Sequence, residues 1–419
     1  MSMTISEIGD RVILSAADLD RLIRLLGVGH RVIGPQVVDG AVVLRDIASA
    51  DQLPAGWLDD QEGGHYRLHR DDSAGPFDHV VGPHSLKNFL FPAREPIARF
   101  ERVEGMWREQ SPSPPPLPLA VIGVRGCDLA ALAVQDRVFL REEGDQGGHV
   151  DPAYKARRDG LFLVAVDCRR AAATCFCHSM GTGPAACSAS AGRTADLTLT
   201  DLGPGPVDSV APGGLERRFA CRIGSERGAA LIAGLSADSP GVRCTRDEEE
   251  AAERVPVDLE RQMWQRRRLD GEGPSASGRQ LDTGNLRDLL FSNLDHPRWE
   301  EVASRCLSCT NCTLVCPTCF CASVTEVTDL TGDHVLRERH WASCFSLDHA
   351  RMHGTSVRHT TASRYRQWLT HKLAGWVDQF GTSGCTGCGR CITWCPVGID
   401  LTEEVAAIRD TPTQKGGQP

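Results

Sequence analysis

A four-cysteine run that occurs twice near the C-terminus constrains this chain more than any other feature. Each run has the spacing Cys-x2-Cys-x2-Cys-x3-Cys-Pro: Cys306, Cys309, Cys312, Cys316 and Pro317 in the first, and Cys385, Cys388, Cys391, Cys395 and Pro396 in the second. Bacterial ferredoxins hold a [4Fe–4S] cluster with this spacing. Structural zinc sites take their cysteines as two separated pairs, so zinc is the weaker interpretation. The runs therefore predict two [4Fe–4S] clusters.

The ligand sets follow from the crossed arrangement of two-cluster ferredoxins, in which the fourth cysteine of each run ligates the other cluster. We expect one cluster on Cys306, Cys309, Cys312 and Cys395, and the other on Cys385, Cys388, Cys391 and Cys316. Thr386, Gly387 and Gly389 suit a backbone packed against a cluster. Since protein thiolates would hold every iron, no position is open to substrate, and one-electron relay is the expected role.

A further group of cysteines lies in the first half of the chain. Apolar strands at 119–124 and 161–166, with a helical pattern at 129–140 between them, predict an α/β unit with a parallel sheet. Cysteines follow both strands, and the carboxyl ends of parallel strands meet at the edge where ligands bind. A candidate third iron–sulfur site therefore consists of Cys127, Cys168, Cys175 and Cys177, with Gly181 and Gly183 allowing close backbone approach. Zinc and unligated core thiols are the alternatives.

The other cysteines and the histidines carry weaker signals. Four interpretations are open for Cys319, Cys321 and Cys344. They are thiols that support a neighbouring cluster, alternative ligands, part of another site, or inert buried residues. No ligating spacing involves Cys187, Cys221 or Cys244. His178 and His371 lie near cysteine segments but are expected to be ordinary structural or surface residues. No phosphate-binding glycine motif and no paired cysteines of a nickel–iron centre occur, so flavin, nicotinamide and nickel are not expected on this chain.

The organisation of the chain predicts an α+β protein, with an N-terminal α/β domain followed by a mainly helical, two-cluster ferredoxin-like domain. The expected parts are an α/β domain at 1–270, a linker at 271–285, the cluster domain at 286–410 and a tail at 411–419. The long spacer between the two cysteine runs excludes the short hairpin of a small ferredoxin. Helical patterns on both sides of the spacer favour a helical ferredoxin arrangement instead.

Composition narrows the class of protein further. No stretch of the 419 residues reaches the about 18 to 20 apolar residues of a membrane span, and the N-terminus does not have the pattern of an export signal. We therefore expect a cytoplasmic protein, whose 18 cysteines serve as metal ligands rather than disulfides. With a net charge of −9 and scattered basic residues, a nucleic-acid role is not expected.

Several phrases of the sequence resemble one family. They are Gly123-Val-Arg-Gly-Cys-Asp, Asp136-Arg-Val-Phe-Leu, Cys175-Phe-Cys-His-Ser-Met-Gly-Thr-Gly-Pro, the segment 306–321, and the segment 371–400. In these phrases the chain resembles the β subunit of cytoplasmic sulfhydrogenases, which are nickel–iron hydrogenases, and the related electron-transfer subunit of anaerobic sulfite reductase. One departure is Gly126, where the family has proline.

The resemblance implies an electron-transfer subunit of a heterotetramer. It would have three partners: a flavin-containing, NAD(P)-binding diaphorase subunit, a small iron–sulfur hydrogenase subunit and the nickel–iron large subunit. In the sulfite-reductase alternative, electrons would pass toward a sirohaem subunit. Two other classes are an enzyme that works alone through an incompletely ligated cluster, and an iron–sulfur sensor. No DNA-reading element supports the sensor.

Overall fold

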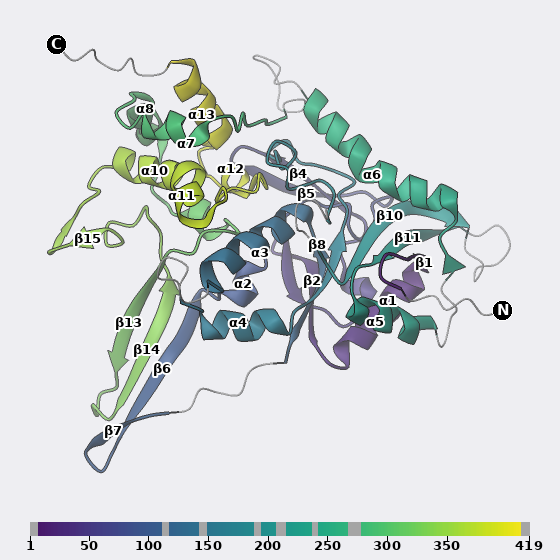
Figure 1. The fold of residues 1–419 in the computed structure, drawn as a ribbon, viewed down its shortest axis with the longest axis horizontal. Coiled ribbons are helices and arrows are strands. Elements are labelled where there is room, and N and C mark those ends of the chain that lie inside the picture. Colours follow the sequence, from purple (N-terminus) through teal and green to yellow (C-terminus); the bar gives the residue numbers. More distant parts are fainter. Residues whose placement is uncertain are drawn as a thin grey trace.

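The fold is that of a computed structural model, described over residues 7–110, 117–141, 149–187, 194–206, 215–236, 242–266 and 278–411. A large sheet with its helices and a cysteine-rich helical region lie toward opposite ends of the long axis (Figure 1). The α+β class expected from the sequence is confirmed. Of the expected linker, only 278–285 lies within the described residues, and of the expected tail only Thr411.

The large sheet has eight strands, of which the central ones are parallel. In sheet order they are β12 (Val242–Arg243), β1 (Arg11–Ser15), β11 (Leu215–Ile223), β10 (Leu197–Pro206), β9 (Phe162–Val166), β8 (Leu119–Val124), β2 (Arg31–Val38) and β3 (Ala41–Asp46). The pairs β10–β9, β9–β8 and β8–β2 are parallel. Strand β9 is buried along its whole length, as expected for a parallel strand covered on both faces.

Helices cover both faces of this sheet, because successive side chains of a strand point to opposite faces. Ile122 and Val164 pack with α1 (Ala16–Gly27) and α5 (Glu226–Ser236), whereas Val121 and Leu163 pack with α3 (Gly126–Phe139) and α4 (Pro152–Asp159). Helix α6 (Arg246–Gln265) contacts β10 and β11. The strand–helix–strand unit expected at 119–166 is therefore present.

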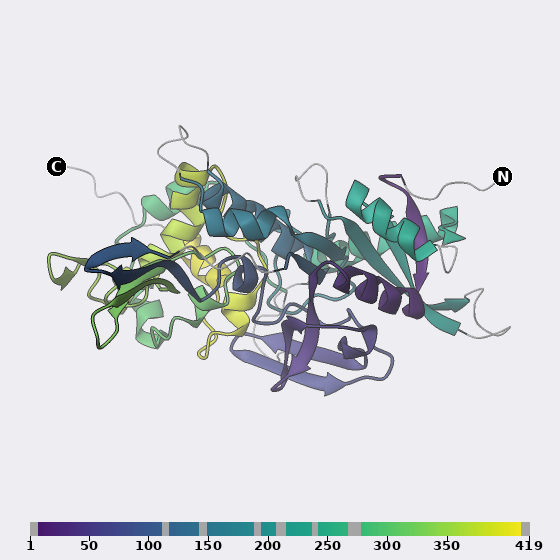
Figure 2. The same cartoon turned by 90° about the horizontal axis from the view of Figure 1, so that it is seen from below.

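A second sheet joins the two ends of the chain. Its order is β13 (Ala322–Thr328), β14 (His334–Trp341), β6 (Arg94–Val103) and β7 (Met106–Glu109). Ion pairs cross it, with Arg94 Nη2 2.6 Å from Glu338 Oε2 and Arg339 paired with Glu95. Figure 2 shows these strands beside the helical region. Residues on both sides of the expected linker thus share one sheet.

The helical region surrounds the two cysteine runs. Its helices are α7 (Leu286–Phe291), α8 (Arg298–Arg305), α9 (Asn311–Leu314), α10 (Thr361–Thr370), α11 (Trp376–Phe380), α12 (Arg390–Thr393) and α13 (Leu401–Asp410). A π-helical turn, η2 (His371–Gly375), joins α10 to α11. Such turns are rare and often mark functional sites. The turn carries Lys372, a buried cation among the cysteine segments.

Smaller elements complete the fold. They are the 3-10 turn η1 (Ala50–Gln52), helix α2 (Lys87–Leu90), the hairpin β4 (Trp57–Glu62) and β5 (His65–Arg70), and the hairpin β15 (Arg351–Met352) and β16 (Thr355–Ser356). The turn between β4 and β5 packs on the second cysteine run. Gly64 has φ +70, and a Cβ there would lie 2.9 Å from the Cys395 carbonyl oxygen. Only glycine allows that approach.

Candidate iron–sulfur sites

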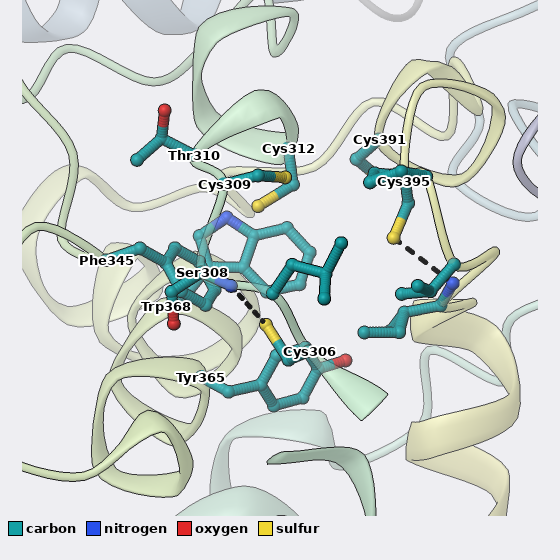
Figure 3. Close-up of a pocket in the computed structure, with 14 residues that line it drawn as sticks. Cys306, Ser308, Cys309, Thr310, Cys312, Phe345, Tyr365, Trp368, Cys391 and Cys395 are labelled. Atoms are coloured by element: carbon teal, nitrogen blue, oxygen red, sulfur yellow. Dashed lines mark hydrogen bonds between the residues drawn. The ribbon is translucent and has the colours of Figure 1, made fainter. Parts of the chain in front are cut away.

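The first-run site is a pocket lined by the first three cysteines of one run and the last cysteine of the other. Its thiols are those of Cys306, Cys309, Cys312 and Cys395, with Cys391 also in the wall. Figure 3 shows Cys395 facing the other three from a separate chain segment. These are the four cysteines that the motif spacing assigns to one cluster. That they ligate iron stays a prediction.

Backbone geometry at the first-run site suits a cluster. The Ser308 N–H lies 3.4 Å from the Cys306 sulfur, and the Ile399 N–H lies 3.3 Å from the Cys395 sulfur. The loop achieves this with left-handed backbone at Ser308 (φ 50) and Thr310 (φ 70). Aromatic and aliphatic side chains form most of the remaining wall. Amide donors aimed at thiolate sulfurs in an apolar wall are what an iron–sulfur cluster requires.

At the second-run site, the four cysteines predicted to ligate the other cluster lie together. Its pocket is lined by Cys316, Cys385, Cys388 and Cys391. The Gly387 N–H lies 3.4 Å from the Cys385 sulfur. A Cβ at Gly387 (φ +64) would lie 2.7 Å from the Cys177 backbone, so glycine is needed here for close packing. Because Cys391 lines both pockets, the two sites are adjacent.

The N-terminal cysteines also gather, beside the second-run site. Cys127, Cys175 and Cys177 belong to one buried apolar cluster, against which the half-buried Cys168 and Cys388 also pack. Cys127 lies in the first turn of α3, after β8, and Cys168 follows β9, the parallel neighbour of β8. The expected meeting of strand ends is therefore observed. Gly183 leaves space beside these thiols, because a Cβ there would lie 3.0 Å from the Cys177 sulfur.

Burial makes these four thiols poor candidates for free thiolates. It raises the pKa of each above the usual value for cysteine, and that of Cys175 to about 12. A coordinating metal deprotonates a thiol outright, so the buried set suits ligation rather than nucleophilic chemistry.

The spacing of the thiols bears on the kind of group they suit. Among the described residues, no three or more His, Cys, Asp or Glu side chains converge to hold a single metal ion. A four-iron cluster takes its thiolates around a cube and therefore spaces them more widely than one tetrahedral ion does.

A buried lysine beside the second-run site was not anticipated from the sequence. Lys372 Nζ, in the π-helical turn, lies 3.2 Å from the Cys316 sulfur and 3.4 Å from the Cys319 sulfur. Burial alone would lower its pKa, but the neighbouring sulfurs outweigh burial and raise it, so the ammonium stays charged. The available signal was its position at helical spacing between Trp368 and Trp376, on the apolar face of the segment.

A buried arginine links the second run to the N-terminal half. Arg390 Nη1 lies 2.9 Å from Asp128 Oδ1, and Arg390 Nε donates to the Gly82 carbonyl at 2.8 Å. Burial would lower the pKa of Arg390, but Asp128 and Cys388 outweigh it and raise the pKa. Cys391 follows Arg390 in the sequence. The Arg390–Asp128 ion pair therefore holds Cys391 near α3, the helix that carries Cys127.

The remaining candidates fall outside these three sets. Cys319, Cys321, Cys344 and His371 line a separate cavity. His178 packs edge-on against Trp264, with ring centroids 4.5 Å apart, and burial lowers its pKa to about 4. Cys187, Cys221 and Cys244 pack in the core around the large sheet.

Comparisons with known proteins agree with the cysteine geometry. Residues 305–399 match the family model of a 4Fe-4S dicluster domain. Over 291 residues the chain is 26% identical to sulfhydrogenase 2 subunit beta of Pyrococcus furiosus, covering 69% of this chain and 74% of that protein. The resemblance inferred from the motifs is thereby confirmed. No solved structure matches the chain. Among the described residues, no helix combines the length and apolar content that crossing a bilayer requires.

Proposed function

We propose that this protein is the iron–sulfur electron-transfer subunit of a multi-subunit nickel–iron hydrogenase of the cytoplasm. It relays electrons between a flavin-containing, NAD(P)-binding diaphorase and the hydrogenase subunits. The observation that carries the proposal is the succession of three cysteine sets. Cys388 contacts the N-terminal set, and Cys391 lines both ferredoxin-type pockets. The similarity to a sulfhydrogenase β subunit supports the hydrogenase assignment.

The proposed ligands are the three sets described above. The first-run cluster takes Cys306, Cys309, Cys312 and Cys395, the second-run cluster takes Cys385, Cys388, Cys391 and Cys316, and a third cluster takes Cys127, Cys168, Cys175 and Cys177. Bound clusters supply reversible one-electron transfer. The protein contributes fixed thiolates, amide donors and a water-poor environment, which together set the potential of each cluster.

The two ends of this series differ in their access to a partner. Cys309 is exposed, and the neighbouring Leu307 is 64% exposed. The N-terminal set is more enclosed, since Cys127, Cys175 and Cys177 are buried. We therefore place the docking site of one electron-transfer partner at the 306–310 loop, where the partner's redox centre approaches the first-run site most closely.

The organisation of the chain follows the same proposal. We place the α/β part with the third site in residues 1–270 and the cluster domain in 286–410, with 271–285 between them. The two parts are interlocked, since β6 of the first pairs with β14 of the second. Both parts also line the second-run site, so we expect the relay to require the full chain.

The decisive experiment is purification of the native complex without oxygen, followed by analysis of its metals and cofactors. We expect stoichiometric nickel and flavin in the complex, and about twelve irons on this chain if all three sets hold [4Fe–4S] clusters, or about eight if only the ferredoxin-type sets do. An intact complex with sirohaem and no nickel would reject the hydrogenase assignment in favour of an anaerobic sulfite reductase. Substrate turnover by the isolated chain would reject the relay role.

A further inference from the structure

A cavity of about 410 Å³ lies next to both ferredoxin-type sites and belongs to neither. Trp368 lines this cavity and the first-run site, and Lys372 lines it and the second-run site. The cavity is partly open to solvent, and its wall includes the exposed His349. Concave sites with a few polar or ligating groups are candidate binding sites.

The cavity wall contains sulfur and nitrogen atoms that can act as soft metal ligands. Cys319 and Cys321 come from the segment that follows the first run, and Cys344 from the segment that follows β14. His349 supplies an imidazole, whereas the ring nitrogens of His371 are hydrogen-bonded to Gln379 and Trp376. Three thiols and one imidazole from separate parts of the chain form a ligand set for iron–sulfur clusters and soft metals.

The donors also contact one another. Cys321 lies beside both Cys344 and His349 in the wall of the cavity. Inert buried cysteines behave as small apolar side chains within a packed core. These cysteines instead line a cavity, and they face an exposed histidine across it.

A local sequence pattern supports the same interpretation. Cys319-Phe320-Cys321 repeats the Cys175-Phe176-Cys177 phrase of the N-terminal set. In both places the phenylalanine packs among other apolar side chains: Phe176 is fully buried, and the Phe320 ring lies 5.3 Å from that of Trp376. Each phenylalanine thus anchors a segment that brings two thiols to one site.

We propose that this cavity holds an additional [4Fe–4S] cluster, ligated by the thiolates of Cys319, Cys321 and Cys344 and by the imidazole of His349. The existence of the site does not depend on the hydrogenase assignment. Its role rests on the proposed relay: it would be a branch point beside both ferredoxin-type clusters, reaching solvent through the exposed His349.

The first test is the iron and sulfide content of Cys344→Ala in the full chain, prepared without oxygen. We expect about four irons and four sulfides fewer than in the wild type, with the EPR signals of the other reduced clusters retained. The matched control is Cys244→Ala, which removes a buried thiol far from the cavity and should change neither quantity. Circular dichroism checks that both variants are folded.

Three results would contradict the proposal that this cavity holds a cluster. One is an unchanged iron content in folded Cys344→Ala. Another is stoichiometric zinc in the wild type that the variant loses. The third is recovery of Cys321 and Cys344 as a disulfide from iron-loaded wild type after anaerobic denaturation. Each leaves the proposed function intact, because that function requires only the clusters of the three sets above.

A second variant keeps the inference testable if Cys344→Ala fails to fold. His349 is exposed, so His349→Cys should fold normally and supply a fourth thiolate. We expect it to retain all the iron, to change the EPR spectrum of one cluster and to lower the reduction potential of that cluster, because histidine ligation raises the potential relative to cysteine. A spectrum and redox titration identical to the wild type would reject His349 as a ligand and overturn the site as proposed.

Discussion

The first-run and second-run sites share one cysteine spacing but differ in their surroundings. Around the first, aromatic and aliphatic side chains form most of the wall and Cys309 is exposed. Around the second, none of the four cysteines is exposed, and two buried cations, Lys372 and Arg390, lie close by. Identical motifs would therefore hold chemically similar clusters in different electrostatic environments. The motif defines the cluster type, while the surrounding side chains determine its potential.

This comparison predicts that the second-run cluster has the higher reduction potential. A reduced cluster carries one more negative charge, which a nearby buried cation stabilises. The described contacts of the first-run thiols are instead with amide donors, at Ser308 and Ile399. Electrons that enter at the exposed loop would then move inward, toward the N-terminal set.

The largest expected effect comes from removing a ligand of the second-run site. Cys388→Ser should remove its cluster, about four irons, or convert it to a three-iron form. Because Cys388 also contacts the N-terminal cysteines, the spectrum of the third cluster should shift as well. Iron analysis and low-temperature EPR measure both effects.

Cys309→Ser is the matched variant at the first-run site. It should disturb only the first-run cluster, because Cys309 is exposed and lines the first-run pocket but not the second-run pocket. Equal perturbation of the N-terminal signal by both variants would contradict the proposed order of sites.

The next effect concerns stability and the buried ion pair. Asp128→Ala leaves the Arg390 guanidinium without its carboxylate, which typically costs ~3–5 kcal/mol for a buried pair. Asp159→Ala breaks an exposed pair with Lys155 and should cost less than ~1 kcal/mol. Guanidinium unfolding of the iron-loaded protein, followed by tryptophan fluorescence, compares the two variants. Similar midpoints would show that the Arg390 contact contributes little.

A smaller effect is expected on the reduction potentials of the two sites when the buried lysine is removed. Lys372→Met should lower the potential of the second-run cluster by ~100 mV, the order expected for one charge a few ångströms away in a medium of effective dielectric constant ~20. The first-run potential should fall by less, because the Coulomb energy decreases with distance from the ammonium. Anaerobic redox titration by EPR measures both potentials. Lys155→Met, at an exposed position, is the control and should change neither.

The smallest effect lies at the hairpin that packs on the second run near Cys395. The Tyr66 and Trp394 rings stack with centroids 5.1 Å apart. Tyr66→Leu should cost ~1–2 kcal/mol through lost stacking and the lost acceptor for the Val42 N–H. Tyr66→Phe retains the stack and separates the two contributions. Equal losses in both variants would assign the whole effect to the hydrogen bond.

Local patterns account for what could be predicted from the sequence. Cysteine spacing indicated the two ligand sets, and apolar strand runs placed Cys127 and Cys168 at neighbouring strand ends, where they lie in the structure. These inferences need only the spacing of residues along one strand, loop or helix.

Contacts between segments that are distant in the sequence could not be predicted, because no periodic pattern encodes them. Arg390 reaches Gly82 across 308 positions of the sequence, and Lys372, in a π-helical turn, contacts Cys316 from 56 positions away. The association of β6 with β14 was likewise not foreseen, since either strand alone is an ordinary polar–apolar segment.

The sheet shared by the two ends of the chain has a consequence for biosynthesis. Strands β6 and β7 leave the ribosome long before β13 and β14, so the early pair waits as an unpaired edge while more than half of the chain is made. Exposed strand edges pair readily with other chains. Truncation after residue 270 should therefore give an aggregating fragment. The two ferredoxin-type sets, each of which draws its fourth cysteine from the other run, would be complete only after the whole polypeptide is made.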